Sequence, residues 1–297
     1  MPKRKDATYL PQNDPFHSIV PYVMPKRTEA EVSITENFDI TELNKYIEKH
    51  NKKSDTQIKL FHCICYAMAR TVYHRPKMNI FIAGRRFWQR KDITLSFVAK
   101  QKFDDQAKEV LLCLKAEPEM SIENISKIIL GDVKNAKKSG GNDLDKTMEF
   151  VGKLPRFILN IVFFVVSRLE YHGLVPDAIS KGDPNYSTVL LSNLGSIGAG
   201  APYHHLSNYG TCSIMITIGT AYHDRLTKRD YVPMTFILDE RIADGFYYAK
   251  SLKLTHHILE NPKLLEEAIS KPINFDVDAK PAKKIKNLVK RKKQLES

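Results

Sequence analysis

This 297-residue sequence has few cysteines and no sorting signal that we can recognise. Its four cysteines include no C-x-x-C pair, which argues against a zinc centre and favours a reducing compartment. The first ten residues, MPKRKDATYL, lack the apolar core that a secretory signal needs. We therefore expect a cytoplasmic protein that holds no metal ion.

The sequence also lacks a long uninterrupted apolar run and the glycine-rich motifs of nucleotide-binding proteins. Its longest apolar segment, 157–169, contains Asn160 and Arg168 and is shorter than the roughly 20 residues of a membrane-spanning helix. We interpret it as a buried amphipathic helix, with membrane contact as the less favoured alternative. No GxGxxG, GxxxxGK[ST] or aromatic-plus-basic pattern occurs, so we do not expect nucleic-acid binding.

Positive charge is abundant and unevenly placed. The formal net charge is +12. Residues 269–297 carry nine Lys or Arg against three acidic residues, so half of the excess lies there. We interpret this segment as a solvated, partly disordered tail that keeps the protein soluble. The alternative is a short basic helix that contacts an acidic partner.

Apolar residues make up 42% of the sequence, enough for the core of one large domain. Their spacing predicts strands at 31–40, 79–84, 93–101, 187–198, 211–223 and 231–240. It predicts helices at 41–50, 57–73 and 244–268, and two or three more between 121 and 173. The segment 106–116 is ambiguous. We expect a single α+β domain built on a large mixed sheet.

Five short segments occur in an order that resembles one known family. They are FDITEL at 38–43, RPKMN at 75–79, LSNLGSIG at 191–198, the D-G pair at 244–245 and LENPKLLEE at 259–267. None is specific alone, but their order and spacing resemble the catalytic cores of 2-oxo acid dehydrogenase acyltransferases. Chloramphenicol acetyltransferases share the fold of those cores.

The resemblance covers residues 18–268 of the chain. It implies a chloramphenicol acetyltransferase-like α+β fold of two layers, with a large mixed β-sheet and flanking helices. Residues 1–17 then form a basic N-terminal arm, and 269–297 form the basic tail. The helical segment near 117–175 looks longer than in the usual core, and we find no lipoyl domain in this chain.

Proteins of this family are homotrimers or multiples of three, with active sites in channels between neighbouring subunits. Coenzyme A enters a channel from one side and the acyl acceptor enters from the other. The resemblance therefore implies a homotrimer or a multiple of three, with coenzyme A or acyl-coenzyme A as a substrate.

The family motif H-x-x-x-D-G supplies a catalytic base, and the serine of S-N-L-G stabilises the oxyanion. The resemblance thus makes Ser192 the oxyanion-stabilising residue and Asp244 the aspartate of the motif. Glu240 stands where the family has its histidine. The residues that the resemblance places along the coenzyme A path are Asn193, Gly195, Ser196, Gly198 and Gly245.

The replacement of histidine by Glu240 makes proton transfer from the acceptor to the base less favourable. Reference pKa values are about 8.5 for a thiol, 6.5 for His and 4.3 for Glu. Transfer to a carboxylate is therefore about 3 kcal/mol less favourable than transfer to imidazole, or about a hundredfold in rate. Burial would raise the pKa of Glu240 and narrow this gap, whereas a contact with Arg241 would keep the carboxylate ionised and structural.

Other residues of the chain offer alternatives. The histidines that lie in or beside polar loops are His204, His205 and His223. We expect each to be a surface or interface group rather than a borrowed base, because base catalysis requires placement within about 3 Å of the proton. His62 is expected to be a packing or capping group. We expect Asp244 to cap the last helix or to pair with Arg27.

Two functions remain open from the sequence. The first is coenzyme A-dependent acyl transfer in which Glu240, or a borrowed histidine, acts as the base. The second is a catalytically inactive relative that serves as a trimeric scaffold or self-assembling particle, whose basic tails meet a partner. The sequence identifies neither the acyl group nor the acceptor.

Overall fold

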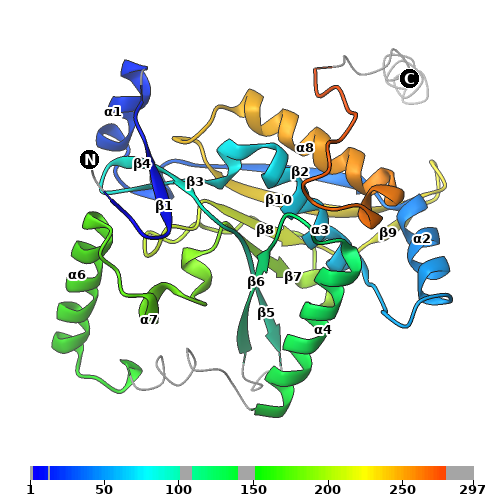
Figure 1. The fold of residues 1–297 in the computed structure, drawn as a ribbon, viewed down its shortest axis with the longest axis horizontal. Helices are drawn as coiled ribbons and strands as arrows, with labels where there is room; N and C mark the ends of the chain where they lie inside the picture. The colour runs from blue at the N-terminus through cyan, green and yellow to red at the C-terminus, as the bar shows by residue number, and fades with distance from the viewer. Residues whose placement is uncertain (1–2, 13, 101–108, 140–150, 279–297) are drawn as a thin grey trace, which may run out of the picture.

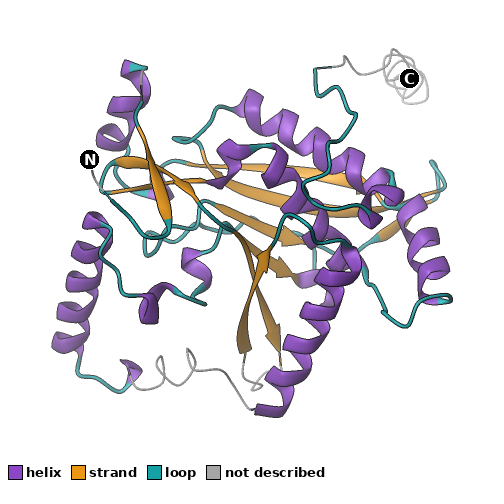
Figure 2. Ribbon diagram, viewed as in Figure 1, coloured by secondary structure: helices purple, strands orange, loops and turns teal. Residues whose placement is uncertain are grey.

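The computed structural model describes residues 3–12, 14–100, 109–139 and 151–278, which form helices and two β-sheets (Figure 2). The larger sheet contains β2 (Glu31–Asp39), β5 (Ile93–Lys100), β6 (Glu109–Ala116), β7 (Val189–Asn193), β8 (Ile214–Ile218), β9 (Tyr222–Asp224) and β10 (Arg229–Asp239). Its strand order is β2-β10-β8-β7-β5-β6, and β9 pairs with β10. The basic tail from residue 279 onward and part of the predicted helical segment, 140–150, lie outside the described residues.

The larger sheet is mixed, as the sequence predicted. Strand β7 runs parallel to both β5 and β8, whereas the other pairs of this sheet are antiparallel. The ambiguous segment 106–116 contains β6, an edge strand that pairs with β5. Parallel pairing of β7 leaves its C-terminal end, where the SNLG segment begins, level with the C-terminal end of β8.

A smaller antiparallel sheet holds the N-terminal residues. It contains β1 (Ala7–Leu10), β4 (Arg86–Arg90) and β3 (Ile80–Ala83), in that order. Just before β1, the Arg4 guanidinium forms ion pairs with Asp6 at 2.9 Å and with Glu170 at 2.8 Å. It also lies over the ring of Phe81 at 4.9 Å. Arg4 therefore connects the N-terminus to a helix that comes much later in the chain.

The helices are α1 (Pro15–Val23), α2 (Thr41–Asn51), α3 (Leu60–His74), α4 (Ile122–Ser139), α6 (Arg156–His172), α7 (Asp177–Ser180) and α8 (Gly245–Glu260). Helices α3 and α8 pack together on one face of the larger sheet (Figure 1). The predicted helices at 41–50 and 57–73 are confirmed, although α3 begins later than predicted. The Asn51 side chain bonds both the N–H and the carbonyl of Ile58, which holds that segment outside the helix.

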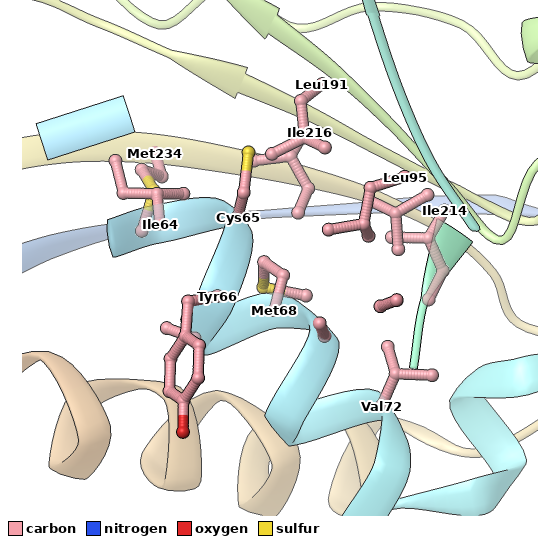
Figure 3. Close-up of a cluster of buried hydrophobic side chains, with 14 of the residues drawn as sticks. Ile64, Cys65, Tyr66, Met68, Val72, Leu95, Leu191, Ile214, Ile216 and Met234 are labelled. Atoms are coloured by element: carbon pink, nitrogen blue, oxygen red, sulfur yellow. The ribbon is translucent and has the colours of Figure 1, made fainter. Parts of the chain in front are cut away.

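Helix α3 lies at the centre of the core because it is apolar around most of its circumference. Every residue from His62 to Val72 is buried. Figure 3 shows Ile64 and Met68 of this helix facing Leu95, Ile216 and other sheet residues. The larger sheet and the helices on it therefore form a rigid support for the loops at the strand ends.

Helix α3 also buries a histidine without an ionic partner. His62 Nδ1 lies 2.8 Å from Ser126 Oγ, and that hydroxyl donates to the Gln57 carbonyl at 2.7 Å. The hydroxyl must therefore accept from Nδ1–H. Burial lowers the pKa of His62 to about 4. The prediction that His62 is a packing group is confirmed.

This burial predicts acid lability. Because the folded-state pKa of His62 lies below the value of about 6.5 in an unfolded chain, the unfolded state binds more protons between pH 6.5 and 4. We expect the free energy of unfolding to fall as the pH falls through this window, and the His62→Gln variant to show a shallower slope. Urea titrations followed by circular dichroism would measure both slopes, and identical slopes would contradict the assignment to His62.

The apolar segment 157–169 forms most of α6, but the prediction that it is buried is wrong. Within one chain Val166 is the only residue of this helix that is fully buried. The helix lies at the edge of the molecule and contacts the smaller sheet, while its other side faces solvent (Figure 1). Among the described residues, no helix combines the length and apolarity needed to cross a bilayer.

Candidate active site

Ser192 is the penultimate residue of strand β7. Its neighbour Leu191 packs into the main core, so the alternation of side chains along the strand directs Ser192 to the other face of the sheet. The side chain is half-buried, and its hydroxyl makes no hydrogen bond within the described part of the chain. The hydroxyl is therefore available to donate a hydrogen bond to a ligand.

A cavity of about 190 Å³ lies at the end of β7 on the face of the sheet that α3 covers, so it is on the opposite face from the Ser192 side chain, and Ser192 does not line it. The SNLG segment contributes Asn193, Gly195 and Ser196, which are three of the five residues predicted to line the coenzyme A path. The remaining lining residues, which the sequence did not indicate, are Leu60, Phe61 and Ile64 of α3 and Ile218, Gly219 and Ala221 after β8. Gly198 and Gly245 do not line this cavity.

Backbone conformation explains why two positions of this segment are glycine. A Cβ atom on Gly195 would lie 2.3 Å from the carbonyl oxygen of Gly219, so only glycine permits this close approach of two backbones. Gly198 has a φ of 78°, in the left-handed region, and ends the 3₁₀ turn η4 (Leu194–Ile197). The path of the chain beyond β7 therefore depends on backbone geometry that these glycines allow.

Glu240 lies immediately after β10, at the other end of the sheet. Its backbone N–H donates to the Ala30 carbonyl at 2.9 Å, which fixes the backbone of the turn. The side chain is exposed and makes neither a hydrogen bond nor an ion pair with any described residue. No side chain in the described part of the same chain orients the Glu240 carboxylate.

The alternative in which Arg241 contacts Glu240 does not occur, because Arg241 points into the protein. Its guanidinium donates two hydrogen bonds to the buried Asp239 carboxylate, at 2.8 and 2.6 Å. A further bond at 2.9 Å goes to the carbonyl of Met24. Arg241 thus stabilises the turn that carries Glu240 without contacting its carboxylate.

Asp239 also explains the position of Arg27. Arg27 Nε lies 3.8 Å from Asp239 Oδ2, and its terminal nitrogens donate to the carbonyls of Ser207 and Gly210. The predicted pair between Arg27 and Asp244 does not form. Asp244 instead caps α8 by accepting a 2.8 Å hydrogen bond from the backbone N–H of Tyr247, which confirms its predicted capping role.

Within one chain, Ser192 and Glu240 cannot act on the same reacting group. Ser192 is level with Thr217 on β8, and Thr217 is level with Thr235 on β10, five residues before Glu240. Five residues of about 3.4 Å and two strand spacings of about 4.8 Å separate the two Cα atoms by roughly 20 Å. A site that used both residues would need two copies of the chain.

The loop histidines are surface groups in a single chain, as expected. His204 is exposed, and His205 Nδ1 lies 2.9 Å from a Glu31 carboxylate oxygen. His223 Nδ1 lies 2.7 Å from Asp230, also at the surface. In the described part of the chain, no group of three or more His, Cys, Asp or Glu side chains is arranged to hold a metal ion.

Comparison with known proteins identifies the fold. No protein-family model and no curated protein sequence matches the chain. Among solved structures, a probable dihydrolipoamide acetyltransferase from Listeria monocytogenes is 17% identical, with a TM-score of 0.57 over 91% of this chain and 98% of that one. Dihydrolipoamide acetyltransferase from Azotobacter vinelandii is 14% identical, with a TM-score of 0.58 over 86% and 94%.

A chloramphenicol acetyltransferase is also similar, at 12% identity and a TM-score of 0.50 over 87% of this chain and 99% of the other. The chain therefore has the chloramphenicol acetyltransferase-like α+β fold, the fold of dihydrolipoamide acetyltransferase catalytic cores. At these identities the similarity defines the fold and leaves the chemistry to the residues of the site.

Proposed function

We propose that the chain is a coenzyme A-dependent acyltransferase that assembles in threes or a multiple of three, with each active site between two copies. The observation that carries the proposal is the cavity at the end of β7, because Asn193, Gly195 and Ser196 of the SNLG segment line it. The separation of Ser192 from Glu240 within one chain supports a site that two copies share.

The shape of this cavity suits one part of coenzyme A. Its volume of about 190 Å³ is smaller than the roughly 300–1,000 Å³ of most small-molecule sites. Its walls combine apolar side chains of α3 and β8 with two glycines and the polar residues Asn193 and Ser196. A narrow cavity of this kind fits part of the pantetheine arm and leaves the nucleotide outside.

In the proposed reaction, a thiol, amine or hydroxyl of the acceptor attacks the thioester carbonyl carbon and gives its proton to Glu240 of a neighbouring copy. The carbonyl oxygen becomes an oxyanion, and the Ser192 hydroxyl donates a hydrogen bond to it. The carbon–sulfur bond then breaks. Coenzyme A leaves as a thiol after it takes the proton from Glu240.

One solved structure bears on these roles. The work on the Azotobacter vinelandii protein concerned a serine, a histidine and an asparagine in its catalytic mechanism, the asparagine four positions after the histidine. Ser192, Glu240 and Asp244 follow the same order, with the same spacing between the last two. We propose that Glu240 occupies the position of the base and that Asp244 holds the turn.

A second candidate function is an inactive scaffold with the same assembly. The exposed, unsupported Glu240 carboxylate favours it, because an efficient base needs a partner that orients it. In this case the fold and the subunit contacts persist while acyl transfer does not. Binding of coenzyme A to the cavity distinguishes the two candidates.

We expect Ser196→Trp to weaken coenzyme A binding at least tenfold, because the indole would fill the cavity that Ser196 borders. Ser196 is exposed, so the substitution should leave folding intact. Isothermal titration calorimetry with coenzyme A measures the effect. Thr227→Trp, in the exposed turn between β9 and β10, is the matched control and should bind as the wild type does.

Two results would count against the proposed function. Equal affinity of the Ser196→Trp variant and the wild type would place the ligand elsewhere. No binding by the wild type at millimolar coenzyme A would favour the scaffold.

A further inference from the structure

Helix α6 exposes a stripe of apolar side chains at the edge of the molecule (Figure 1). Phe157, Ile161 and Phe164 follow the i, i+4, i+7 spacing that places residues on one helical face. Their side chains are 66%, 59% and 67% exposed. The opposite side of α6 carries the buried Val166. The helix therefore has two apolar sides, and within one chain only one of them is covered.

Helix α1 exposes a second apolar set beside the first. Its members are each more than half exposed, and they are Phe16, Ile19, Tyr22 and Val23. The turn between β3 and β4 joins the two helices. Its Arg85 guanidinium lies over the Tyr22 ring at 4.7 Å, and a Cβ atom on Gly84 would lie 2.1 Å from the Tyr171 carbonyl oxygen near the end of α6. We use the term α1–α6 face for the four residues of α1 together with Phe157, Ile161, Phe164, Val165, Tyr171 and Leu174.

The α1–α6 face is large for an exposed apolar surface. It holds ten of the nineteen large apolar side chains that are exposed in the described residues. Because an aromatic side chain offers about 150–250 Å² when it is fully exposed, these partly exposed residues present on the order of 1,000 Å². The largest apolar patch of a typical monomer is about 300–600 Å². A patch of this size indicates a surface that something else covers.

The charges around the α1–α6 face are positive. Arg156 begins α6, Arg168 continues the exposed stripe one turn after Phe164, and Arg85 lies between the two helices. None of the three pairs with an acidic side chain in the described ranges.

Acidic side chains on the two helices are few and already have partners. Glu170 is the only acidic residue of α6, and its carboxylate lies 2.8 Å from the Arg4 guanidinium. Helix α1 contains no acidic residue, and Asp14, which caps it, lies 2.5 Å from His17 Nδ1. The face therefore combines apolar side chains with cations that lack a counter-ion.

This combination suits the surface of a bilayer that contains anionic lipid. A helix that lies in the plane of the membrane interface buries one apolar side below the headgroups, while Lys and Arg contact anionic lipids. An arginine guanidinium can donate two hydrogen bonds to one phosphate group. In this chain the other side of α6 packs on the smaller sheet, so the protein itself covers the side that would otherwise face water.

The same features fit a protein occupant less well. Two copies that met through this face would bring the arginines of both chains together, and like charges across an interface are unfavourable. Of the residues in the face, only Tyr171 lines the neighbouring cavity of about 330 Å³. Most of the face therefore projects outward, as insertion into a membrane interface requires.

We infer that the α1–α6 face binds the surface of a membrane that contains anionic lipid, with α6 parallel to the bilayer plane. The aromatic side chains enter the region between headgroups and acyl chains, and Arg85, Arg156 and Arg168 contact lipid phosphates. This inference goes beyond the proposed function and does not depend on it. It reverses the preference drawn from the sequence, in which membrane contact is the less favoured alternative.

Flotation with lipid vesicles tests the inference. The wild type should float with phosphatidylcholine–phosphatidylserine vesicles, float much less with phosphatidylcholine alone, and bind more weakly as salt is raised. The double variant Ile161→Glu/Phe164→Glu should weaken binding to the anionic vesicles at least about tenfold, because two buried apolar side chains are lost. Leu226→Glu is the control, since Leu226 is 94% exposed in the turn between β9 and β10 and is not part of the face.

Arg85 offers a second variant that leaves the apolar residues intact. Arg85 and Lys228 are exposed cations with φ values of 58° and 55°, in the left-handed region that glycine adopts without strain. Neither Arg85→Gly nor Lys228→Gly should therefore destabilise the fold. We expect Arg85→Gly to weaken binding to anionic vesicles about fivefold. Lys228→Gly, in the β9–β10 turn, removes the same charge away from the face and should bind as the wild type does.

Circular dichroism and sedimentation velocity establish that each variant is folded and keeps the wild-type assembly. Arg85→Gly carries the test if the double variant does not fold. A wild type that does not float with anionic vesicles would overturn the inference, and so would folded face variants that float as the wild type does. Equal weakening by Lys228→Gly would show that net charge, and not this face, attracts lipid. A double variant that dissociates into smaller species would identify the face as a contact between copies and would also overturn the inference.

Discussion

Asp239→Ala is expected to lower the free energy of unfolding by about 3–5 kcal/mol, because removal of one partner leaves buried charges uncompensated. The Asp239 side chain has no exposed surface, and the Arg241 and Arg27 side chains are only 3% and 5% exposed. Burial lowers the pKa of Arg27, and the Asp239 charge opposes that shift. Without Asp239, two guanidinium groups would remain buried beside each other.

Guanidinium chloride titrations followed by circular dichroism measure this cost. Glu42→Ala is the control, because Glu42 also pairs with a cation, Lys45 at 2.7 Å, but both side chains are largely exposed. Its cost should be less than about 1 kcal/mol. A similar small cost for Asp239→Ala would mean that the buried pair contributes little and that other contacts hold the turn.

Glu240→His is expected to raise the rate of acyl transfer from acetyl-coenzyme A to small thiols by up to about a hundredfold. The pKa of imidazole is closer to that of a thiol by about 2 units, which is about 3 kcal/mol of proton-transfer free energy. Ser192 and the cavity at the end of β7 are unchanged by the substitution. Release of free coenzyme A, measured with a chromogenic thiol reagent, reports the rate.

Glu240→Gln is the companion variant, because it keeps the shape of the side chain and removes its ability to accept a proton. A fall in a measurable wild-type rate would identify Glu240 as the working base. If the wild type and both variants are inactive and none binds coenzyme A, the acyltransferase proposal fails and the scaffold remains.

The sequence predicted those elements whose periodicity is uninterrupted. Strand β2, helix α2 and most of α3 have clean strand or helix spacing, and the structure confirms them. Helix α1 was missed because Pro21 interrupts the segment, although Asp14 caps this helix through backbone N–H groups and Pro15 occupies its first position. Strand β4 was missed because it is only five residues long and begins and ends with arginine.

The candidate site was predictable only where it is local in sequence. Asn193, Gly195 and Ser196 line one cavity because a single loop supplies all three, whereas Gly198 and Gly245 do not line it, and the role of these residues in binding coenzyme A stays a prediction. The ion-pair partner of Arg241 was not predictable, because three acidic residues, Asp239, Glu240 and Asp244, lie near it in sequence. Only the structure shows that Asp239 is the buried one and that Arg241 pairs with it. The sequence did not show that α6 is exposed within one chain. Apolar residues indicate that a helix face is covered, but they do not show whether the same chain or another molecule covers it.

The link between Arg4 and Glu170 has a consequence for the order in which the molecule is made. The two residues are 166 positions apart, so Arg4 emerges from the ribosome long before its partner exists. At about 5–20 residues per second, the delay is roughly 10–30 s. Strand β1 can pair sooner, because its partner strand β4 ends at Arg90 and is synthesised much earlier than Glu170. During synthesis the N-terminal segment can therefore join its sheet early, but it closes over α6 only after more than half of the chain has been translated.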